Sequence, residues 1–379
     1  MSVTIPLYPE TLFGYYLQLT ALALGGWRGP VTGQIVINDP NEYVNLVENA
    51  RNQTIWIRLG GLESRERVCE RLKGPKLYGK GPKLYRQDYD ILRKVNLLGA
   101  EKEDWCTATL NYVERVINSG RPLGGSVSPL MLFRATIYGK SRGIELGTVK
   151  DLAGSTTIDS IGLGLIGGLA SYIGNFKLED QYEYFLIPDG SPDSIDDING
   201  VLEAFHGATL GLGSLVDRIK GLATSIKEGL SLDLATYFST LIHALEARDR
   251  SEKLRGLIDR MAFEKVLLVR NAIGDRPQIM WISPLTISQI VNEVKIKGAE
   301  EVLISLYKLA PKAPDFISKC INLTILYLWS GQPDFLKECT RKLAVLSDYT
   351  QEDVNMRNLA GNVNRLLSQM GRLAELKSS

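Results

Sequence analysis

Histidine and cysteine are scarce in this chain, and neither is arranged for metal binding. Of 379 residues, only His206 and His243 are histidine, and the four cysteines lie far apart with no Cys-x-x-Cys pair. A structural zinc site needs four nitrogen and sulfur ligands at closer spacing, and a catalytic zinc site needs three. We therefore expect structural histidines, no metal, no cofactor and no histidine-based catalytic dyad. The cysteines are Cys69, Cys106, Cys320 and Cys339.

A long uninterrupted apolar run is also missing. The best candidate, residues 158–176, contains Asp159 and five glycines, whereas a membrane-spanning helix needs about 20 predominantly apolar residues. The opening MSVTIPLYPE lacks a basic region followed by an apolar run, so no secretory signal is expected. These features predict no membrane partner and a cytoplasmic protein whose cysteines stay reduced, as small buried apolar groups.

Net charge is close to zero, but the charges are unevenly distributed. Residues 51–150 carry nineteen basic and ten acidic side chains, whereas residues 151–250 carry six and fifteen. Such polarity can steer a polyanion toward one surface, and an acidic region can equally dock a basic partner. Mutual neutralisation of two neighbouring lobes is the competing interpretation.

The order of predicted elements indicates an α+β fold. A mixed α/β region is expected over 1–298, with a possible sub-boundary near 150, followed by an α-helical C-terminal bundle over 299–379. Strands are predicted at 34–38, 54–59, 181–187, 265–270 and 278–282. Helices are predicted at 11–24, 40–51, 104–118, 158–177, 210–227, 232–247, 299–310, 315–329, 333–347 and 352–376.

A short basic repeat is the most distinctive motif. The unit Gly-Pro-Lys-Leu-Tyr occurs twice at a seven-residue period within residues 73–94. Its glycines and prolines rule out one continuous helix, so we expect a surface loop or a strand-turn-strand ribbon. Lysines suit phosphates and tyrosines can stack on bases, which predicts nucleic-acid contact; a solvated loop with packed tyrosines is the alternative. The candidate contacts are Lys73, Lys76, Tyr78, Lys80, Lys83, Tyr85 and Arg86.

A second basic segment lies within residues 124–147. An apolar stretch around Arg134 is followed by Lys140, Ser141 and Arg142 between two glycines. This pattern predicts a strand that ends in a small basic loop, where the hydroxyl and glycine amides could hold a phosphate beside the cations. A plain hairpin turn is the alternative. The candidate contacts here are Arg134, Lys140 and Arg142.

One segment matches a motif of nucleotide-binding enzymes. Gly162, Gly164 and Gly167 spell Gly-x-Gly-x-x-Gly, and Asp189 follows at the distance of a ribose-binding acid. The segment before the glycines is a poor buried strand, and no further βαβ unit follows. A nucleotide- or dinucleotide-dependent enzyme is therefore an alternative hypothesis, and close helix packing is the competing explanation of the glycines.

The chain resembles the large subunit of archaeal subtype I-A CRISPR Cascade complexes. The resemblance rests on PLYPETLFGYYLQLTALALGGW, on SPLMLFRATIYGKSRG and on the helical tail. It implies a non-enzymatic subunit of an antiviral complex that contacts the guide-RNA handle and the flanking motif of the target DNA. It also implies partners: Cascade backbone and small subunits, and a recruited helicase-nuclease. A scaffold that contacts only proteins is the third hypothesis.

Overall fold

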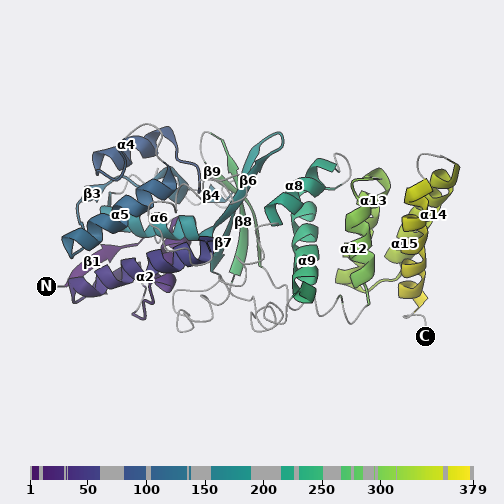
Figure 1. The fold of residues 1–379 in the computed structure, drawn as a ribbon, viewed down its shortest axis with the longest axis horizontal. Helices are drawn as coiled ribbons and strands as arrows, with labels where there is room; N and C mark the ends of the chain where they lie inside the picture. The colour runs from purple at the N-terminus through teal and green to yellow at the C-terminus, as the bar shows by residue number, and fades with distance from the viewer. Residues whose placement is uncertain are drawn as a thin grey trace, which may run out of the picture. The chain divides into compact units, whose positions relative to one another are not determined.

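The computed structural model confirms the α+β class and divides the chain into two compact units. One unit comprises Met1–Gly213 and Phe263–Leu285, and the other comprises Ser214–Ala262 and Thr286–Ser379; we call them the mixed unit and the helical unit (Figure 1). The helical unit takes in helices before residue 299, where the sequence placed the start of the bundle. The structure describes residues 2–7, 12–29, 31, 33–59, 81–99, 104–134, 136–137, 155–188, 215–225, 230–250, 266–274, 277–284, 294, 298–312, 314–352 and 357–375.

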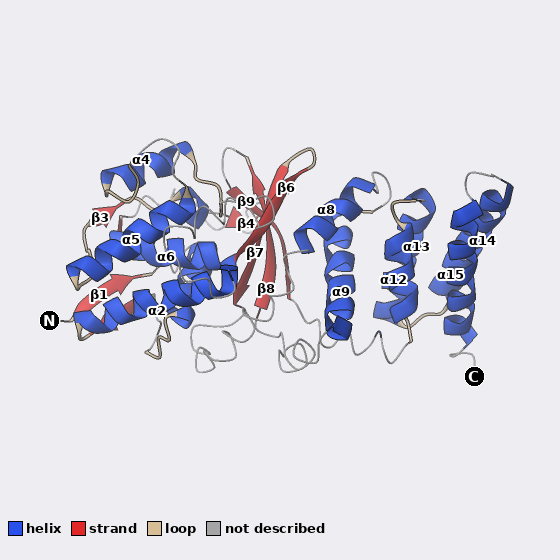
Figure 2. Cartoon of the chain, in the orientation of Figure 1, coloured by secondary structure: helices blue, strands red, loops and turns tan. Residues whose placement is uncertain are grey.

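Helices on one side of a five-stranded sheet build the mixed unit (Figure 2). The sheet order is β4-β9-β8-β7-β6, antiparallel except for the parallel pair β4–β9. Its strands are β4 (Thr136–Ile137), β6 (Tyr172–Lys177), β7 (Gln181–Pro188), β8 (Val266–Ile273) and β9 (Pro277–Pro284). The helices are α1 (Leu12–Leu24), α2 (Pro40–Leu59), α4 (Arg86–Lys94), α5 (Trp105–Ser119), α6 (Ile158–Ser171) and the 3-10 helix η1 (Met131–Arg134). Two small antiparallel pairs join β1 (Val3–Pro6) to β2 (Gln34–Ile37) and β3 (Ser126–Val127) to β5 (Thr156–Thr157).

Helix α6 lies in the core of the mixed unit and is buried from its second residue to its last. It contacts α1, α2, α5 and β7, and its glycines allow that approach. A Cβ at Gly162 or Gly164 would overlap the rings of Tyr112 and Phe133, and one at Gly167 would overlap the carbonyl oxygen of Leu17. Close packing therefore explains these glycines.

The dinucleotide interpretation of the same glycines is wrong. That fingerprint requires the glycines in a loop before a helix, where backbone N–H groups face the pyrophosphate. Here the helix begins at Ile158, so Gly162, Gly164 and Gly167 stand inside it, covered by neighbouring side chains. Asp189 lies outside the described residues.

Two other local predictions also need correction. Residues 54–59 continue α2 rather than forming a strand, and the hydroxyl of Thr54 donates to the carbonyl of Ala50 within that helix. The helix predicted over 158–177 stops at Ser171, because Tyr172 begins a strand that pairs with Phe185 of β7. The strand near 181–187 and the hairpin of β8 and β9 are confirmed.

The helical unit contains α8 (Leu215–Ser225), α9 (Leu232–Arg250), α12 (Glu300–Leu309), α13 (Pro314–Ser330), α14 (Asp334–Glu352) and α15 (Arg357–Glu375). Helix α12 contacts α13 and α15, and α14 contacts the same two, so four helices enclose one core. Helix α9 packs on α8 and on α12. Val363, Leu366 and Met370 of α15 are fully buried in this core.

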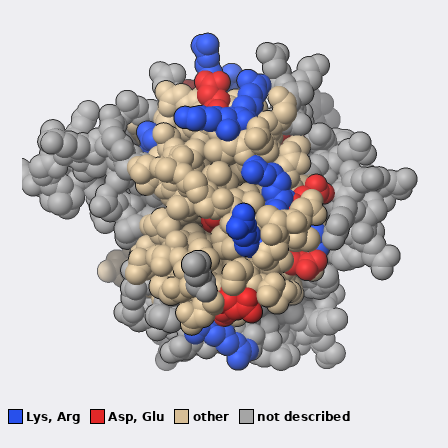
Figure 3. Space-filling view, turned by 90° about the vertical axis from the view of Figure 1, so that its left-hand side faces the viewer, with Lys and Arg blue, Asp and Glu red and all other residues tan. Residues whose placement is uncertain are grey.

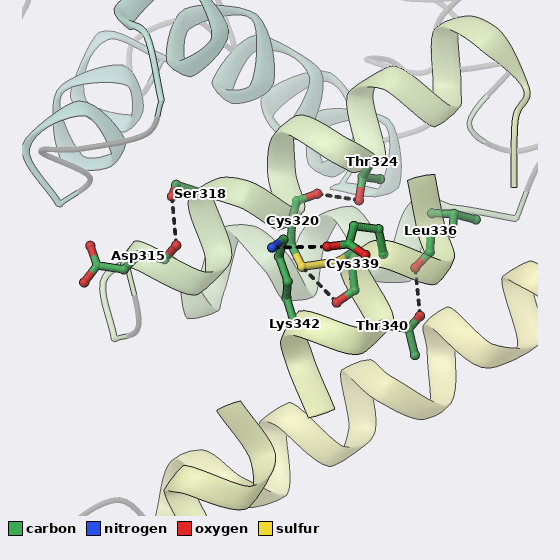
Figure 4. The surroundings of a disulfide bond; sticks show 9 residues. Asp315, Ser318, Cys320, Thr324, Leu336, Cys339, Thr340 and Lys342 are labelled. Atoms are coloured by element: carbon green, nitrogen blue, oxygen red, sulfur yellow. Dashed lines mark hydrogen bonds and ion pairs between the residues drawn. A yellow bond between two sulfur atoms is a disulfide. The ribbon is translucent and has the colours of Figure 1, made fainter. Parts of the chain in front are cut away.

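A disulfide joins two helices of this bundle. Cys320 of α13 and Cys339 of α14 are bonded, with 4.9 Å between their Cα atoms, and both residues are fully buried (Figure 4). The prediction that the cysteines stay reduced is therefore wrong for this pair. Their separation of 19 residues carried no signal of pairing, since only packing of α13 against α14 brings the sulfurs together.

Candidate nucleic-acid interface

The second copy of the basic repeat leads directly into helix α4. Gly81 and Pro82 are buried, and Gly81 has a positive φ of 87° beside the side chain of Trp105. The helix begins at Arg86, so the prediction of a loop or ribbon is wrong for residues 86–94. Every glycine and proline of the repeat precedes Arg86, and the sequence that follows contains no helix breaker. Lys73, Lys76, Tyr78 and Lys80 lie outside the described residues.

Tyr85 is buried rather than available for stacking. Its exposed fraction is 8%, and its backbone N–H donates to Oδ2 of Asp88 at 2.9 Å, which begins α4. Burial raises the pKa of its phenol far above the ordinary value, and the carboxylates of Glu183 and Asp88 add to the effect. The predicted stacking role of Tyr85 is therefore wrong. Its ring instead supports the ammonium of Lys83, whose Nζ lies 4.9 Å from the ring centroid.

Lys83 is exposed, but its backbone is hydrogen-bonded to a buried side chain. Its N–H donates to Oε1 of Glu183 at 2.6 Å, and Glu183 lies on β7 with only 2% of its surface exposed. Burial raises the pKa of Glu183 to about 7, while the N–H and the ammonium of Lys83 act in the opposite direction. The sheet thus anchors the basic segment through a carboxylate that the sequence did not single out.

Asp88 brings the two predicted basic segments together. Its Oδ2 accepts from the N–H of Tyr85 and its Oδ1 accepts from the N–H of Met131, the first residue of η1, at 2.8 Å. Burial raises the pKa of Asp88 to about 6, opposed by these two hydrogen bonds and by the guanidinium of Arg134. Arg134 is half-buried at the end of η1. Lys140 and Arg142 lie outside the described residues.

Cations dominate the solvent side of α4. Arg86, Asp90, Arg93 and Lys94 fall at helical spacing, so they share one face. Arg86 and Lys94 are exposed, and the guanidinium of Arg93 lies 5.7 Å from the ring centroid of Tyr89. We call the set Lys83, Arg86, Arg93 and Lys94 the α4 surface. Figure 3 shows the face of the molecule on the left of Figure 1, where lysine and arginine gather most densely toward the upper edge, the level of α4.

Three cations of the α4 surface, Lys83, Arg86 and Lys94, are exposed. Among the described residues, no ion pair involves Lys83, Arg86 or Lys94. Arg115 of α5 adds a further cation nearby, since it donates to the carbonyls of Val95 and Asn96 after the end of α4. Sequence reasoning missed Lys94 and Arg115 as contacts. The helical spacing of Arg86, Arg93 and Lys94 was the available signal, but residues 73–94 had been interpreted as non-helical.

The other buried carboxylate of the mixed unit is structural. Asp159 accepts from the hydroxyl of Tyr112 at 3.0 Å and from the N–H groups of Leu123 and Gly124 at 3.0 and 2.7 Å. Tyr112 in turn lies 2.5 Å from the hydroxyl of Tyr43. Burial raises the pKa of Asp159; its partner Tyr112 is fully buried, and Leu123 and Gly124 are partly buried. The network ties α2, α5 and α6 together.

The described part of the chain contains no cluster of three or more His, Cys, Asp and Glu side chains suited to a metal ion. Within the same residues, no helix is long and apolar enough to span a membrane. Comparison with protein-family models, with curated proteins and with solved structures found no match.

Proposed function

We propose that this protein is a non-catalytic nucleic-acid-binding subunit that grips a sugar-phosphate backbone on the α4 surface. One observation carries the proposal: Lys83, Arg86 and Lys94 present exposed cations, none of them in an ion pair with a described residue, on a segment whose backbone N–H groups donate to buried carboxylates. Phosphates bind such cations through charge, and the fixed backbone reduces the ordering that binding requires.

The buried ring of Tyr85 restricts the mode of binding. Because the ring of Tyr85 is buried, the segment of Lys83 and Arg86 contacts phosphates and sugars through its cations rather than a base face through this ring. Such contacts position a strand but do not read its sequence. This division of labour suits a guide-RNA complex, in which base pairing supplies sequence specificity while protein holds the backbone and the short flanking motif.

The salt dependence of binding tests this function. In the triple variant K83A/R86A/K94A, binding of labelled duplex DNA or guide RNA should weaken, and the slope of log affinity against log salt should flatten by about 0.7 to 0.9 per lost phosphate contact. The variant K308A/K312A/K319A removes three exposed cations from the helical unit and serves as the charge-matched control. Equal affinity and slope in both variants would reject the α4 surface as the binding site.

The assignment to a CRISPR interference complex is the finer part of the proposal. It is supported by the resemblance of the opening segment, of residues 128–143 and of the helical tail to archaeal Cascade large subunits. The expected partners are guide RNA, target DNA, the backbone and small subunits, and the helicase-nuclease. Guide RNA with its 5′ handle should compete for the protein better than an RNA of equal length and scrambled handle. Equal competition would contradict the assignment while leaving general nucleic-acid binding intact.

A protein-only scaffold is the second candidate, and one observation favours it. The helical unit exposes large apolar side chains, with Trp329 at 61%, Val345 at 58% and Leu326 at 39%. Exposed apolar groups of this size suit protein partners. The scaffold hypothesis predicts that the full chain ignores DNA and RNA at low salt yet co-purifies with fixed proteins; measurable nucleic-acid affinity at the α4 surface excludes the protein-only form.

A further inference from the structure

Glu183 is hydrogen-bonded to the backbone of the exposed Lys83, and its neighbour across the strands, Asn271, has an amide without a hydrogen-bond partner among the described residues. The register of β7 and β8 places Asn271 directly opposite Glu183, and side chains of directly opposed residues on antiparallel strands lie close enough to interact. Asn271 is fully buried, and neither its amide oxygen nor its amide nitrogen has a hydrogen-bond partner among the described residues. On its other side, Glu183 accepts from the N–H of Lys83.

Asn271 can pair with either form of Glu183. The ionised carboxylate accepts from the amide N–H group, and the neutral acid can also donate its O–H to the amide oxygen, so protonation costs no hydrogen bond at this position. The raised pKa of Glu183, about 7, is consistent with this environment because burial disfavours the charged form. The neutral acid retains a carbonyl oxygen for the N–H of Lys83.

Within the described part of the chain, few other charges face Glu183. Helix α1, which packs on β7, carries no charged residue, and the one charge of α6, Asp159, is satisfied by its own partners. Arg270 lies on the opposite side of β8, since it precedes Asn271, and Lys177 is exposed at the end of β6. The segment before α4 supplies Lys83, Tyr85 and Asp88. The negative charge of Glu183 therefore acts mainly on Lys83, whose positive charge it partly offsets.

We propose that Glu183 is a positioning residue that couples nucleic-acid binding on the α4 surface to uptake of a proton, so that the bound strand favours the neutral acid. The inference rests on the proposed function. A phosphate beside Lys83 adds negative charge near Glu183, and protonation removes the repulsion while the hydrogen bond to the Lys83 backbone persists. By linkage, whatever binds the protonated form more tightly also promotes protonation.

The affinity of the full chain for labelled duplex DNA, measured at constant salt on both sides of neutrality, tests the proposal. Wild-type protein should bind about threefold more tightly near pH 6.5 than near pH 8.5, because one nearby negative charge disappears. Glu183→Gln, which keeps an acceptor for Lys83 but cannot ionise, should bind tightly at both values and lose most of this pH dependence. Glu183→Ala removes the acceptor and should bind weakly at both.

The outcomes distinguish a failure of the proton coupling from a failure of nucleic-acid binding itself. Parallel pH dependence in wild type and Glu183→Gln overturns the proton coupling but leaves nucleic-acid binding in place. Failure of the wild type to bind DNA or guide RNA at either pH overturns the proposed function itself. Calorimetry of the wild type in two buffers of different ionisation enthalpy gives a check that needs no variant: net proton uptake on binding supports the coupling, and zero uptake near neutral pH contradicts it.

Discussion

Single residues in the mixed unit show how packing and charge decide local behaviour. Gly167 has no room for a side chain because α1 crosses α6 at that position, whereas Glu183 stays buried because it holds the backbone of Lys83. Neither role is visible in local sequence. Both follow from which element lies against the residue in the folded chain.

Replacing Gly167 with alanine should destabilise the mixed unit. The added Cβ would overlap the carbonyl oxygen of Leu17, which is backbone and can yield only by moving α1. Overpacking of this kind costs about 1 to 3 kcal/mol, measurable by urea unfolding. Gly361→Ala is the matched control, because that glycine lies exposed within α15 with open space around it, and the change should stabilise by about 0.5 to 1 kcal/mol. Equal effects from both changes would contradict this packing.

Replacing Glu183 with glutamine should change how stability depends on pH. The folded-state pKa, about 7, lies above the ordinary value of a glutamate, so the contribution of this group is greatest in acid and is lost as pH rises through 7. Relative to wild type, Glu183→Gln should gain stability between pH 5 and pH 8, by about 3 kcal/mol at most. Denaturant unfolding at the two pH values measures the gain, and a constant difference between the two proteins would exclude it.

At the scale of elements, the sequence predicted most helices and the central strands but misjudged several segments, among them residues 131–134, which form a 3-10 helix where a strand is predicted. Periodicity identified β7, the hairpin of β8 and β9, and the helices of the bundle, since their apolar spacing is sustained. Residues 54–59 are apolar and β-branched and look like a strand, yet they extend α2. Residues 86–94 were grouped with the glycines and prolines before them, and the helix at 158 ends where pairing with β7 begins. Tertiary contacts decided these cases.

The candidate site was also only partly predictable, because its charges are visible in the sequence but the contacts that assemble it are not. The basic character of Lys83, Arg86 and Arg134 is evident in sequence, and the structure brings their segments together. The connection is Asp88, which looks like an ordinary surface acid until the fold buries it between Tyr85 and Met131. The burial of Tyr85 was not predictable, because a repeat does not reveal which of its residues the fold will cover.

The stability of the helical unit should depend on the disulfide between α13 and α14. The bond between Cys320 and Cys339, 19 residues apart, closes a loop in the unfolded chain, and such a cross-link stabilises the folded state by about 2 to 4 kcal/mol. The variant C320A/C339A should therefore unfold at lower temperature in its helical unit, and reductant should have less effect on it than on wild type. Mass spectrometry of peptides digested without reductant would detect the bond directly; two free thiols at these residues would contradict it.

At the scale of the whole molecule, the two units should respond to different conditions. Nucleic acid is expected to bind the mixed unit, and the disulfide of α13 and α14 lies in the helical unit. Unfolding of a chain with two compact units need not be a single transition.

Calorimetric unfolding should therefore show two separable effects. Saturating duplex DNA should raise the transition of the mixed unit, by about 2.7 kcal/mol at a concentration 100 times the dissociation constant. Loss of the Cys320–Cys339 bond, in the variant C320A/C339A, should lower the transition that DNA leaves unchanged. The triple variant K83A/R86A/K94A supplies the control, since it should lose the response to DNA and leave the transition of the helical unit in place. A single transition shifted by both DNA and C320A/C339A would show that the units unfold as one.

The interleaving of the two units along the chain constrains how the protein can be made and divided. Strands β8 and β9 complete the sheet of the mixed unit, although they follow α8 and α9, which belong to the other unit. The ribosome must therefore release residues beyond 285 before the first unit can close its sheet. A fragment cut after residue 213 would leave the edge of β7 uncovered and prone to pair with other chains, so shorter versions for study must retain the returning hairpin.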